Sequence, residues 1–245
     1  MSGFVQSGRF STAAWTPLSL GSTMKLWLDA DDAATFTYSS GVVVSQWNDK
    51  SGNNNHAAQA TVGNQPTRST NQINGKAAVR FPGGSAHYLQ IANFASGFTA
   101  GEVFLVFKTD ADPASGSNPS GLWKFTSDTT NAHVPFTDGN VYDHWGTTAR
   151  KSTGNPSASF TSWRLYNVRS ASGAWSNHID GTQHYSTATN TVGFGTGDHL
   201  LGAGPVAFFL VGYIAAVIIC DTVLSSGDRT SLHTWAATEY GLTIA

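Results

Sequence analysis

Hydrophobic residues along this chain recur in short runs separated by turns rich in Gly, Asn, Ser and Pro, a pattern typical of β-strands. In the run 102–109 both alternating faces are apolar, so we expect that strand to be buried on both sides. Asp180-Gly181 predicts a tight hairpin, because this pair readily adopts positive φ angles. The predicted strands are 24–29, 42–47, 77–81, 87–91, 102–109, 121–126, 162–169, 173–179, 198–202 and 206–221, the last one bent or split.

One segment, 227–240, has the signals of an α-helix. Ser225 can cap its first turn, with Asp228 three residues further on, and Gly241 suits the position after its last turn. The residues that form its apolar stripe are Leu232, Trp235, Ala236 and Tyr240.

The segment 200–220 contains no charged residue and is long enough for a membrane helix. However, Gly202, Gly204, Pro205 and Gly212 interrupt it, β-branched and aromatic residues fill it, and no cluster of Lys or Arg flanks it. We therefore predict two buried strands that break near Gly202–Pro205, and no insertion into a membrane.

The composition shows few charged residues and gives no indication of thiol chemistry. Charged residues make up 11% of the 245 residues, compared with about 25% in a typical protein, and the formal net charge is −2. No basic surface for nucleic acid is therefore predicted. The single cysteine, Cys220, lies in an apolar run and is expected to be a buried thiol.

We divide the chain into an N-terminal arm, 1–22, and one domain, 23–245, and predict an all-β fold.

The order and spacing of several blocks resemble a known superfamily. The blocks are Leu26–Asp29, Trp47-Asn-Asp49 with Ser51-Gly-Asn53, Asn74-Gly75 through Phe81, Tyr88-Leu89, Ile179-Asp180-Gly181, and Gly212-Tyr-Ile214 through Asp221 with Leu224-Ser225 and the terminal helix. Over about 26–241 the chain resembles the concanavalin A-like lectin/glucanase superfamily, in its laminin-G-like jelly-roll branch. The resemblance implies a two-sheet antiparallel jelly-roll sandwich with one short C-terminal helix, and ligands on the concave face or the rim loops. Many relatives are modules of secreted, surface and bacteriophage virion proteins.

The sequence gives little support for an enzyme. Retaining glucanases of that superfamily carry Glu-x-Asp-x-Glu on one strand, whereas this chain has only Glu102 and Glu239. Asp29 and Asp31 are more typical of a turn, and no GxSxG elbow is present. Ala216 also stands where such domains often carry an acidic residue. We predict no catalytic residue, and glycoside hydrolysis is only a remote alternative.

One loop has the pattern of a calcium site. Asp49, Ser51 and Asn53 place oxygen atoms at alternate positions, as calcium loops do, but the acidic residue that closes an EF-hand loop is missing. The alternative is a turn whose side chains bond to their own backbone. Calcium is the one cofactor left open, since the histidines lack zinc-site spacing.

A glycan platform is predicted at Tyr142, Asp143, His144 and Trp145, because sugars stack on aromatic faces and bond to acidic, amide and imidazole groups. The alternative is a short strand whose Trp145 packs in the core. The other tryptophans that lie in strand or helix patterns are expected in the core: Trp27, Trp47, Trp163, Trp175 and Trp235.

Two functions remain from the sequence. The first is a non-enzymatic virion structural or accessory protein, such as a capsid-decorating, tail or fibre component, made in a host cytoplasm and assembled as a homo-oligomer. Its arm would contact neighbouring virion subunits through Phe4, Phe10 and Trp15. The absence of a secretory signal favours this interpretation. The second is a free-standing lectin-like protein, extracellular or at a cell surface, whose partner is a glycan.

Overall fold

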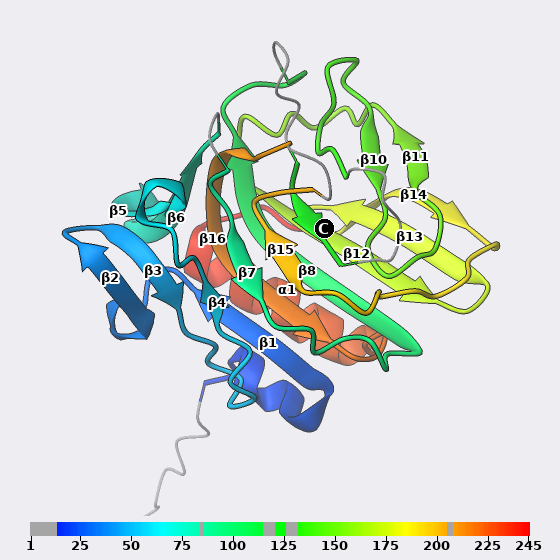
Figure 1. Cartoon of the computed structure of the whole chain (residues 1–245). Coiled ribbons are helices and arrows are strands. Elements are labelled where there is room, and N and C mark those ends of the chain that lie inside the picture. Colours follow the sequence, from blue (N-terminus) through cyan, green and yellow to red (C-terminus); the bar gives the residue numbers. More distant parts are fainter. Residues whose placement is uncertain (1–13, 84–85, 115–120, 126–131, 205–207) are drawn as a thin grey trace, which may run out of the picture.

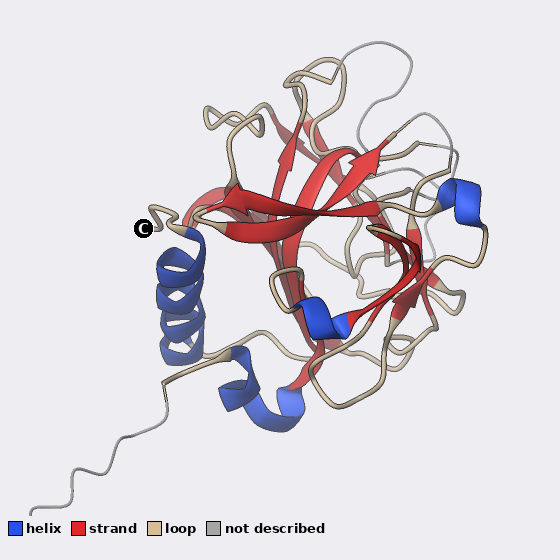
Figure 2. Cartoon of the chain, turned by 90° about the vertical axis from the view of Figure 1, so that its left-hand side faces the viewer, coloured by secondary structure: helices blue, strands red, loops and turns tan. Residues whose placement is uncertain are grey.

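The structure, a computed structural model, describes residues 14–83, 86–114, 121–125, 132–204 and 208–245. Within these ranges, antiparallel strands form a sandwich of two layers, and one helix covers the outer side of one layer (Figure 1, Figure 2). The predicted all-β sandwich with a short C-terminal helix is therefore confirmed.

The layer that carries the helix, which we call the back sheet, contains the longest strands. Its order is β14 (Thr182–Thr187), β13 (Ala174–Ile179), β12 (Arg164–Ala171), β8 (Ala100–Thr109) and β16 (Val211–Cys220). The first half of β16 pairs with β6 (Lys76–Pro82), and its second half pairs with β1 (Met24–Asp29).

The opposite layer, which we call the front sheet, is built from short strands. Its order is β3 (Val43–Trp47), β4 (Ala57–Ala58), β7 (Leu89–Ile91), β15 (His199–Leu201) and β9 (Trp123–Lys124), with β2 (Phe36–Ser40) paired to β3. The strand β5 (Thr67–Ile73) pairs with β6 and meets β3 at Val43, so it links the two sheets. A separate ribbon contains β10 (Val141–Asp143) and β11 (Lys151–Gly154), and the 3₁₀ helices are η1 (Pro17–Thr23), η2 (Ala33–Thr35) and η3 (Val62–Asn64).

Two apolar clusters explain why β8 and β16 have few polar positions. Val103, Leu105 and Phe107 of β8 pack into the core between the sheets. Phe104 and Val106 of the same strand pack into a second core beneath the helix. The strand β16 alternates in the same way, so the predicted burial of 102–109 on both faces is confirmed.

The helix α1 (Ser226–Tyr240) follows the predicted signals closely. The Ser225 Oγ accepts a hydrogen bond from the Asp228 N–H at 3.1 Å. Gly241 has a φ of 64°, the left-handed conformation that ends many helices. Leu232, Ala236 and Tyr240 are buried against the back sheet, and Trp235 packs partly on the same cluster.

The uncharged segment 200–220 contains the last two residues of β15 and all of β16, with Gly202 between the strands at a φ of 83°. The hairpin after β13 has positive φ angles at Asp180 and Gly181, as predicted. Among the described residues, no helix has the length and apolarity needed to cross a membrane. The prediction missed β2, β5, β11 and β14, which lie at sheet edges or corners, where polar residues replace the apolar alternation. It also missed β4, a strand of only two residues between β3 and β7.

Part of the predicted arm packs on its own domain. Leu20 of η1 is buried beneath α1, and Trp15 packs partly on the same cluster. Trp15 thus contacts its own domain but keeps part of its surface exposed, and its contact with a partner stays a prediction. Phe4 and Phe10 lie outside the described residues.

Candidate functional site

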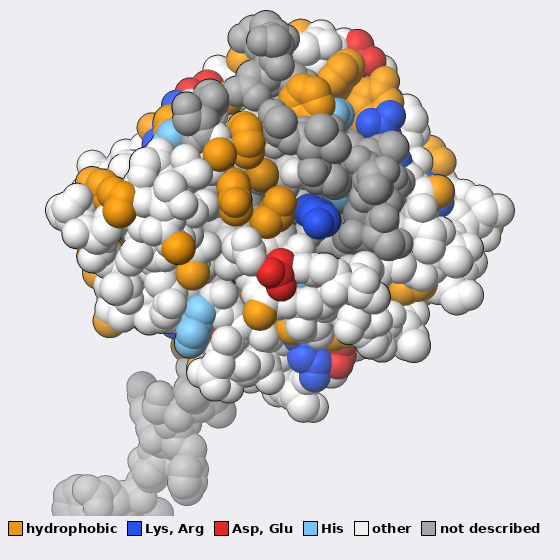
Figure 3. Space-filling view, in the orientation of Figure 1, with side chains coloured by type: hydrophobic (Ala, Val, Ile, Leu, Met, Phe, Trp, Pro, Cys, Tyr) orange, Lys and Arg blue, Asp and Glu red, His pale blue; other side chains and the backbone are white. Residues whose placement is uncertain are grey.

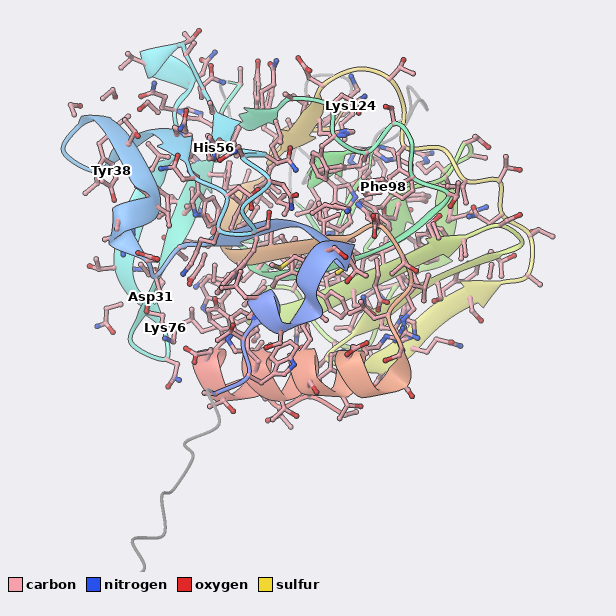
Figure 4. The ribbon with its side chains drawn as sticks, turned by 90° about the horizontal axis from the view of Figure 1, so that it is seen from below. Asp31, Tyr38, His56, Lys76, Phe98 and Lys124 are labelled. Atoms are coloured by element: carbon pink, nitrogen blue, oxygen red, sulfur yellow. The ribbon has the colours of Figure 1, made fainter. Side chains whose placement is uncertain are left out.

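The outer face of the front sheet carries a row of side chains supplied by five strands. The register pairs Gln46 with Ala58, Ala58 with Gln90, Gln90 with Leu200, and Leu200 with Lys124. Their neighbours along each strand, such as Leu89 and Ile91, point inward and are buried. The row lies on the side of the sandwich opposite α1, as the positions of His56 and Lys124 show (Figure 4).

An open depression of about 390 Å³ lies over the β4 and β7 part of this face. Isolated acidic, basic and histidine groups stand on this face among uncharged polar and hydrophobic side chains (Figure 3). Small alanines leave the space, and larger polar and aromatic groups surround it. The lining residues are His56, Gln59, Tyr88, Gln90 and Asp198, with Ala58, Ala60 and Ala92.

Hydrogen bonds fix the polar groups of the depression. The Gln90 Nε2 donates to the Asp198 Oδ2 at 2.5 Å, which joins β7 to the start of β15. The His56 Nδ1 accepts from the Asp49 N–H at 3.0 Å, so the neutral ring carries its proton on Nε2. The depression therefore combines a carboxylate acceptor, an amide and an imidazole donor, the groups that bind hydroxyls in polar ligands.

An aromatic ring borders these polar groups. Tyr88 is half-buried and stacks on Phe209, with ring centroids 6.5 Å apart and planes within 11°. The Tyr88 carbonyl accepts from the Gln59 Nε2 at 3.2 Å, which ties the backbone of this segment to the β4 side. Tyr88 thus offers the depression a supported aromatic surface.

A cation stands at the far end of the row. Lys124 is partly exposed on β9, next to Leu200. Within the described part of the chain it forms no ion pair, so its ammonium is available to an acceptor on a ligand.

The burial of three of its four residues contradicts the predicted glycan platform at 142–145. Asp143, His144 and Trp145 have no exposed surface, and Trp145 packs edge-on against Phe194 with centroids 4.9 Å apart. A sugar cannot stack on a ring that is enclosed in the core. Only Tyr142 is partly exposed, and its hydroxyl donates to the Asp138 Oδ2 at 2.8 Å.

The Asp143 carboxylate organises the core instead. Its Oδ1 accepts from the Trp123 Nε1 at 3.1 Å and from the Trp145 N–H at 2.8 Å, and its Oδ2 accepts from the Tyr166 hydroxyl at 2.7 Å. Burial raises the pKa of Asp143 despite these hydrogen bonds, which lower it. The polar composition of 142–145 therefore reflects a buried hydrogen-bond network.

The predicted calcium loop has the geometry of a self-bonded turn. The Asp49 Oδ1 accepts from the backbone N–H groups of Trp27 and Ser51, and its Oδ2 accepts from the Ser51 hydroxyl and the Asn55 N–H, all within 3.0 Å. The Asn53 side chain donates to the Met24 carbonyl. The oxygens of Asp49 are thus already bonded, and the turn that the sequence left as an alternative fits better. No cluster of three or more His, Cys, Asp or Glu suited to a metal occurs among the described residues.

The acidic residues considered as catalytic groups are all engaged in ion pairs with basic side chains. Glu102 is buried beneath α1 and bonded to two arginines. Glu239 and Asp31 both pair with Lys76, and Asp29 pairs with Lys50.

The sequence did not predict the front depression, because its lining residues come from three distant parts of the chain: 56–60, 88–92 and Asp198. Alternation in Leu89-Gln90-Ile91 does place Gln90 on the outer face. No pattern, however, indicates that β15 pairs with both β7 and β9.

Of the comparisons with known proteins, the one with solved structures supports the fold. No family model matches the chain, and no curated protein matches it in sequence. Among solved structures, it is similar to domain 4 of AbnA, an extracellular arabinanase of Geobacillus stearothermophilus in complex with arabinotriose. That match has 12% identity and a TM-score of 0.57, and covers 86% of this chain and 98% of the other.

Two further matches are parts of larger proteins. The receptor-binding domain of a botulinum neurotoxin C/D mosaic serotype has 12% identity and a TM-score of 0.58, with 87% of this chain and 51% of the other covered. Trypanosoma rangeli sialidase with sialic acid has 12% identity and a TM-score of 0.53, with 93% and 34% covered. The chain thus spans about half of the neurotoxin chain and a third of the sialidase. The fold is that of lectin-like β-sandwich domains, and the virion role stays a prediction.

Proposed function

We propose that the chain is a non-catalytic carbohydrate-binding protein whose glycan binds in the depression on the front sheet. The observation that carries this proposal is the supported ring of Tyr88 beside the bonded pair Gln90–Asp198 in one open depression. An aromatic face next to fixed donors and acceptors matches a sugar ring, which has apolar C–H faces and a rim of hydroxyls.

The groups in the depression have complementary roles. The sugar ring lies against Tyr88, whose own stacking on Phe209 holds the phenol ring in place. One hydroxyl donates to the Asp198 carboxylate, and another accepts from the His56 Nε2. Because the Gln90 amide already bonds to Asp198, the acceptor is oriented before the ligand arrives, which lowers the entropic cost of binding.

Known proteins of the same fold support this choice over the virion role. The arabinanase domain is described with arabinotriose. A botulinum neurotoxin type C whose cell entry depends on two ganglioside molecules also matches, with 10% identity and a TM-score of 0.56. The proposal of glycan binding rests on the depression in this chain. The similar proteins support it because they show that the same fold occurs in proteins described with glycans.

The test is a glycan array probed with the intact chain, followed by calorimetry with the best ligand. We expect at least one neutral oligosaccharide to bind above background. Tyr88→Ala should weaken it by about tenfold or more, because the stacking surface is lost. Gln90→Ala should weaken it as well, because Asp198 loses its fixed orientation.

Tyr38→Ala is the matched control. Tyr38 is also half-buried and also stacks on a phenylalanine, Phe36, with centroids 5.8 Å apart, but it lies on β2 outside the depression (Figure 4). An array without any hit would refute the function. Full affinity in Tyr88→Ala would refute the site.

A further inference from the structure

A second polar cluster lies on the other side of the sandwich, where α1 begins. Its centre is Glu102, whose carboxylate has no exposed surface. The Oε1 accepts from the Asn167 Nδ2 at 3.0 Å, the Arg169 Nε at 3.2 Å and the Arg229 Nε at 2.8 Å. The Oε2 accepts from the Leu224 N–H at 2.8 Å and the Arg229 Nη2 at 3.0 Å. These donors occupy the whole acceptor capacity of the carboxylate.

The charges of this cluster do not cancel. Two guanidinium groups share one carboxylate, so a net charge of about +1 remains, because arginine stays protonated in proteins. Burial, together with the charge of the two guanidinium groups, lowers the pKa of His178 to about 3, which keeps that neighbouring imidazole neutral. The surplus of positive charge lies at Arg169 and Arg229, while Asp228 in the first turn of α1 bonds to the Ser225 hydroxyl.

Arg169 directs part of this charge outward. Its Nε bonds to Glu102 and to the Asn167 Oδ1, but within the described residues its two terminal amino groups have no hydrogen-bond acceptor. The side chain is 24% exposed. It lines a groove of about 270 Å³ between the β13–β14 hairpin and the segment that enters α1.

The groove adds hydroxyl and amide groups to this guanidinium. The register places Arg169 opposite Ser176, and Ser176 opposite Ser186, so the three side chains share one face. The Gln183 Nε2 donates to the Ser186 Oγ at 3.2 Å. Ala171, Ala174 and Val223 provide apolar lining, and among the described residues no acidic side chain lines the groove.

We propose that this groove binds the carboxylate of an acidic sugar, with Arg169 as its anchor. Two parallel amino groups of a guanidinium match the two oxygens of a carboxylate, and a surplus of one positive charge matches one negative charge. Ser176, Ser186 and Gln183 then bind hydroxyls of the sugar ring. This site is independent of the front depression, because it lies on the back sheet.

The test is a nuclear magnetic resonance titration of the ¹⁵N-labelled full chain with glucuronate, glucose, acetate and N-acetylglutamate. We expect glucuronate to shift the amide signals of Ser176 and Ser186 and to bind about tenfold or more tightly than the other three probes. Equal binding of glucuronate and glucose would overturn the carboxylate anchor. Binding of N-acetylglutamate as tight as that of glucuronate would overturn the sugar assignment in favour of an acidic peptide.

Two variants test the anchor with little risk to folding. Gln183→Glu places a negative charge in the groove at an exposed position and should weaken glucuronate about tenfold. Arg169→Lys keeps the charge that Glu102 needs but loses the two-point geometry, and should remove the preference for glucuronate over glucose. Gln72→Glu, on β5 outside the groove, makes the same change in net charge and should bind normally.

Unchanged glucuronate affinity in Gln183→Glu would refute the site. Tyr88→Ala separates this proposal from the front depression, since it should leave the groove titration unaffected while it weakens neutral glycans.

Discussion

Glu102 on β8 and Arg229 on α1 form a two-point ion pair across 127 positions of the sequence. The Nε–Oε1 distance is 2.8 Å and the Nη2–Oε2 distance is 3.0 Å. Because the carboxylate is fully buried, this pair fixes the first turns of the helix against the back sheet. The pair also explains how an acidic residue can open an otherwise apolar strand.

Glu102→Gln should destabilise the fold by about 3–5 kcal/mol, because it leaves two arginines facing a neutral group in a buried site. The measurement is the free energy of unfolding in urea. Glu239→Gln is the control, since Glu239 forms a partly exposed pair with Lys76 and its loss should cost less than about 1 kcal/mol. Equal effects of the two substitutions would contradict the role assigned to Glu102.

Trp145→Ala should destabilise the chain by about 3–5 kcal/mol, as expected for a large side chain removed from a packed core. At temperatures where the variant remains folded, its glycan affinity should match that of the wild type, since the ring is not exposed. Thermal unfolding and calorimetry check the two parts. A selective loss of glycan binding with normal stability would restore the platform interpretation of 142–145.

Removal of calcium should leave the stability unchanged. The four hydrogen bonds accepted by the Asp49 carboxylate come from the protein itself. A chelator should therefore not lower the melting temperature, whereas Asp49→Ala should cost about 2–4 kcal/mol through orphaned backbone donors. A rise in melting temperature on addition of calcium would instead support a metal at Asp49, Ser51 and Asn53.

Local signals predicted the elements whose structure depends on nearby residues. The cap at Ser225, the Gly241 stop and the Asp180-Gly181 hairpin each involve groups within a few positions. The largely apolar strands β8 and β16 were also predictable, since burial on both faces leaves few polar positions.

The candidate sites depend on which strands are neighbours in the sheet, and the sequence alone does not reveal that strand order. Gln90 and Asp198 meet because β7 pairs with β15, and Arg169 meets Ser176 through the β12–β13 register. The composition of 142–145 is equally suited to a sugar platform and to a buried network around Asp143. Only burial separates these two interpretations, and burial depends on the whole fold.

His199 should make the fold sensitive to acid. Its ring is buried, stacks on Phe125 with centroids 4.4 Å apart, and has its pKa lowered to about 4 by burial. Between about pH 6.5 and pH 4 the unfolded chain therefore binds more protons than the folded one at this residue, so stability falls as the pH falls through that window. The loss from His199 alone approaches about 3 kcal/mol at the acid end.

His199→Phe removes the titrating group and keeps an aromatic ring in the stack. The free energy of unfolding of this variant should fall less steeply from pH 6.5 to pH 4 than that of the wild type, and the two curves should run parallel above pH 7. Because the other titrating groups, including His133 and His178, are present in both proteins, the difference between the curves isolates His199. A constant difference across the whole range would show that His199 is protonated equally in the folded and unfolded chains.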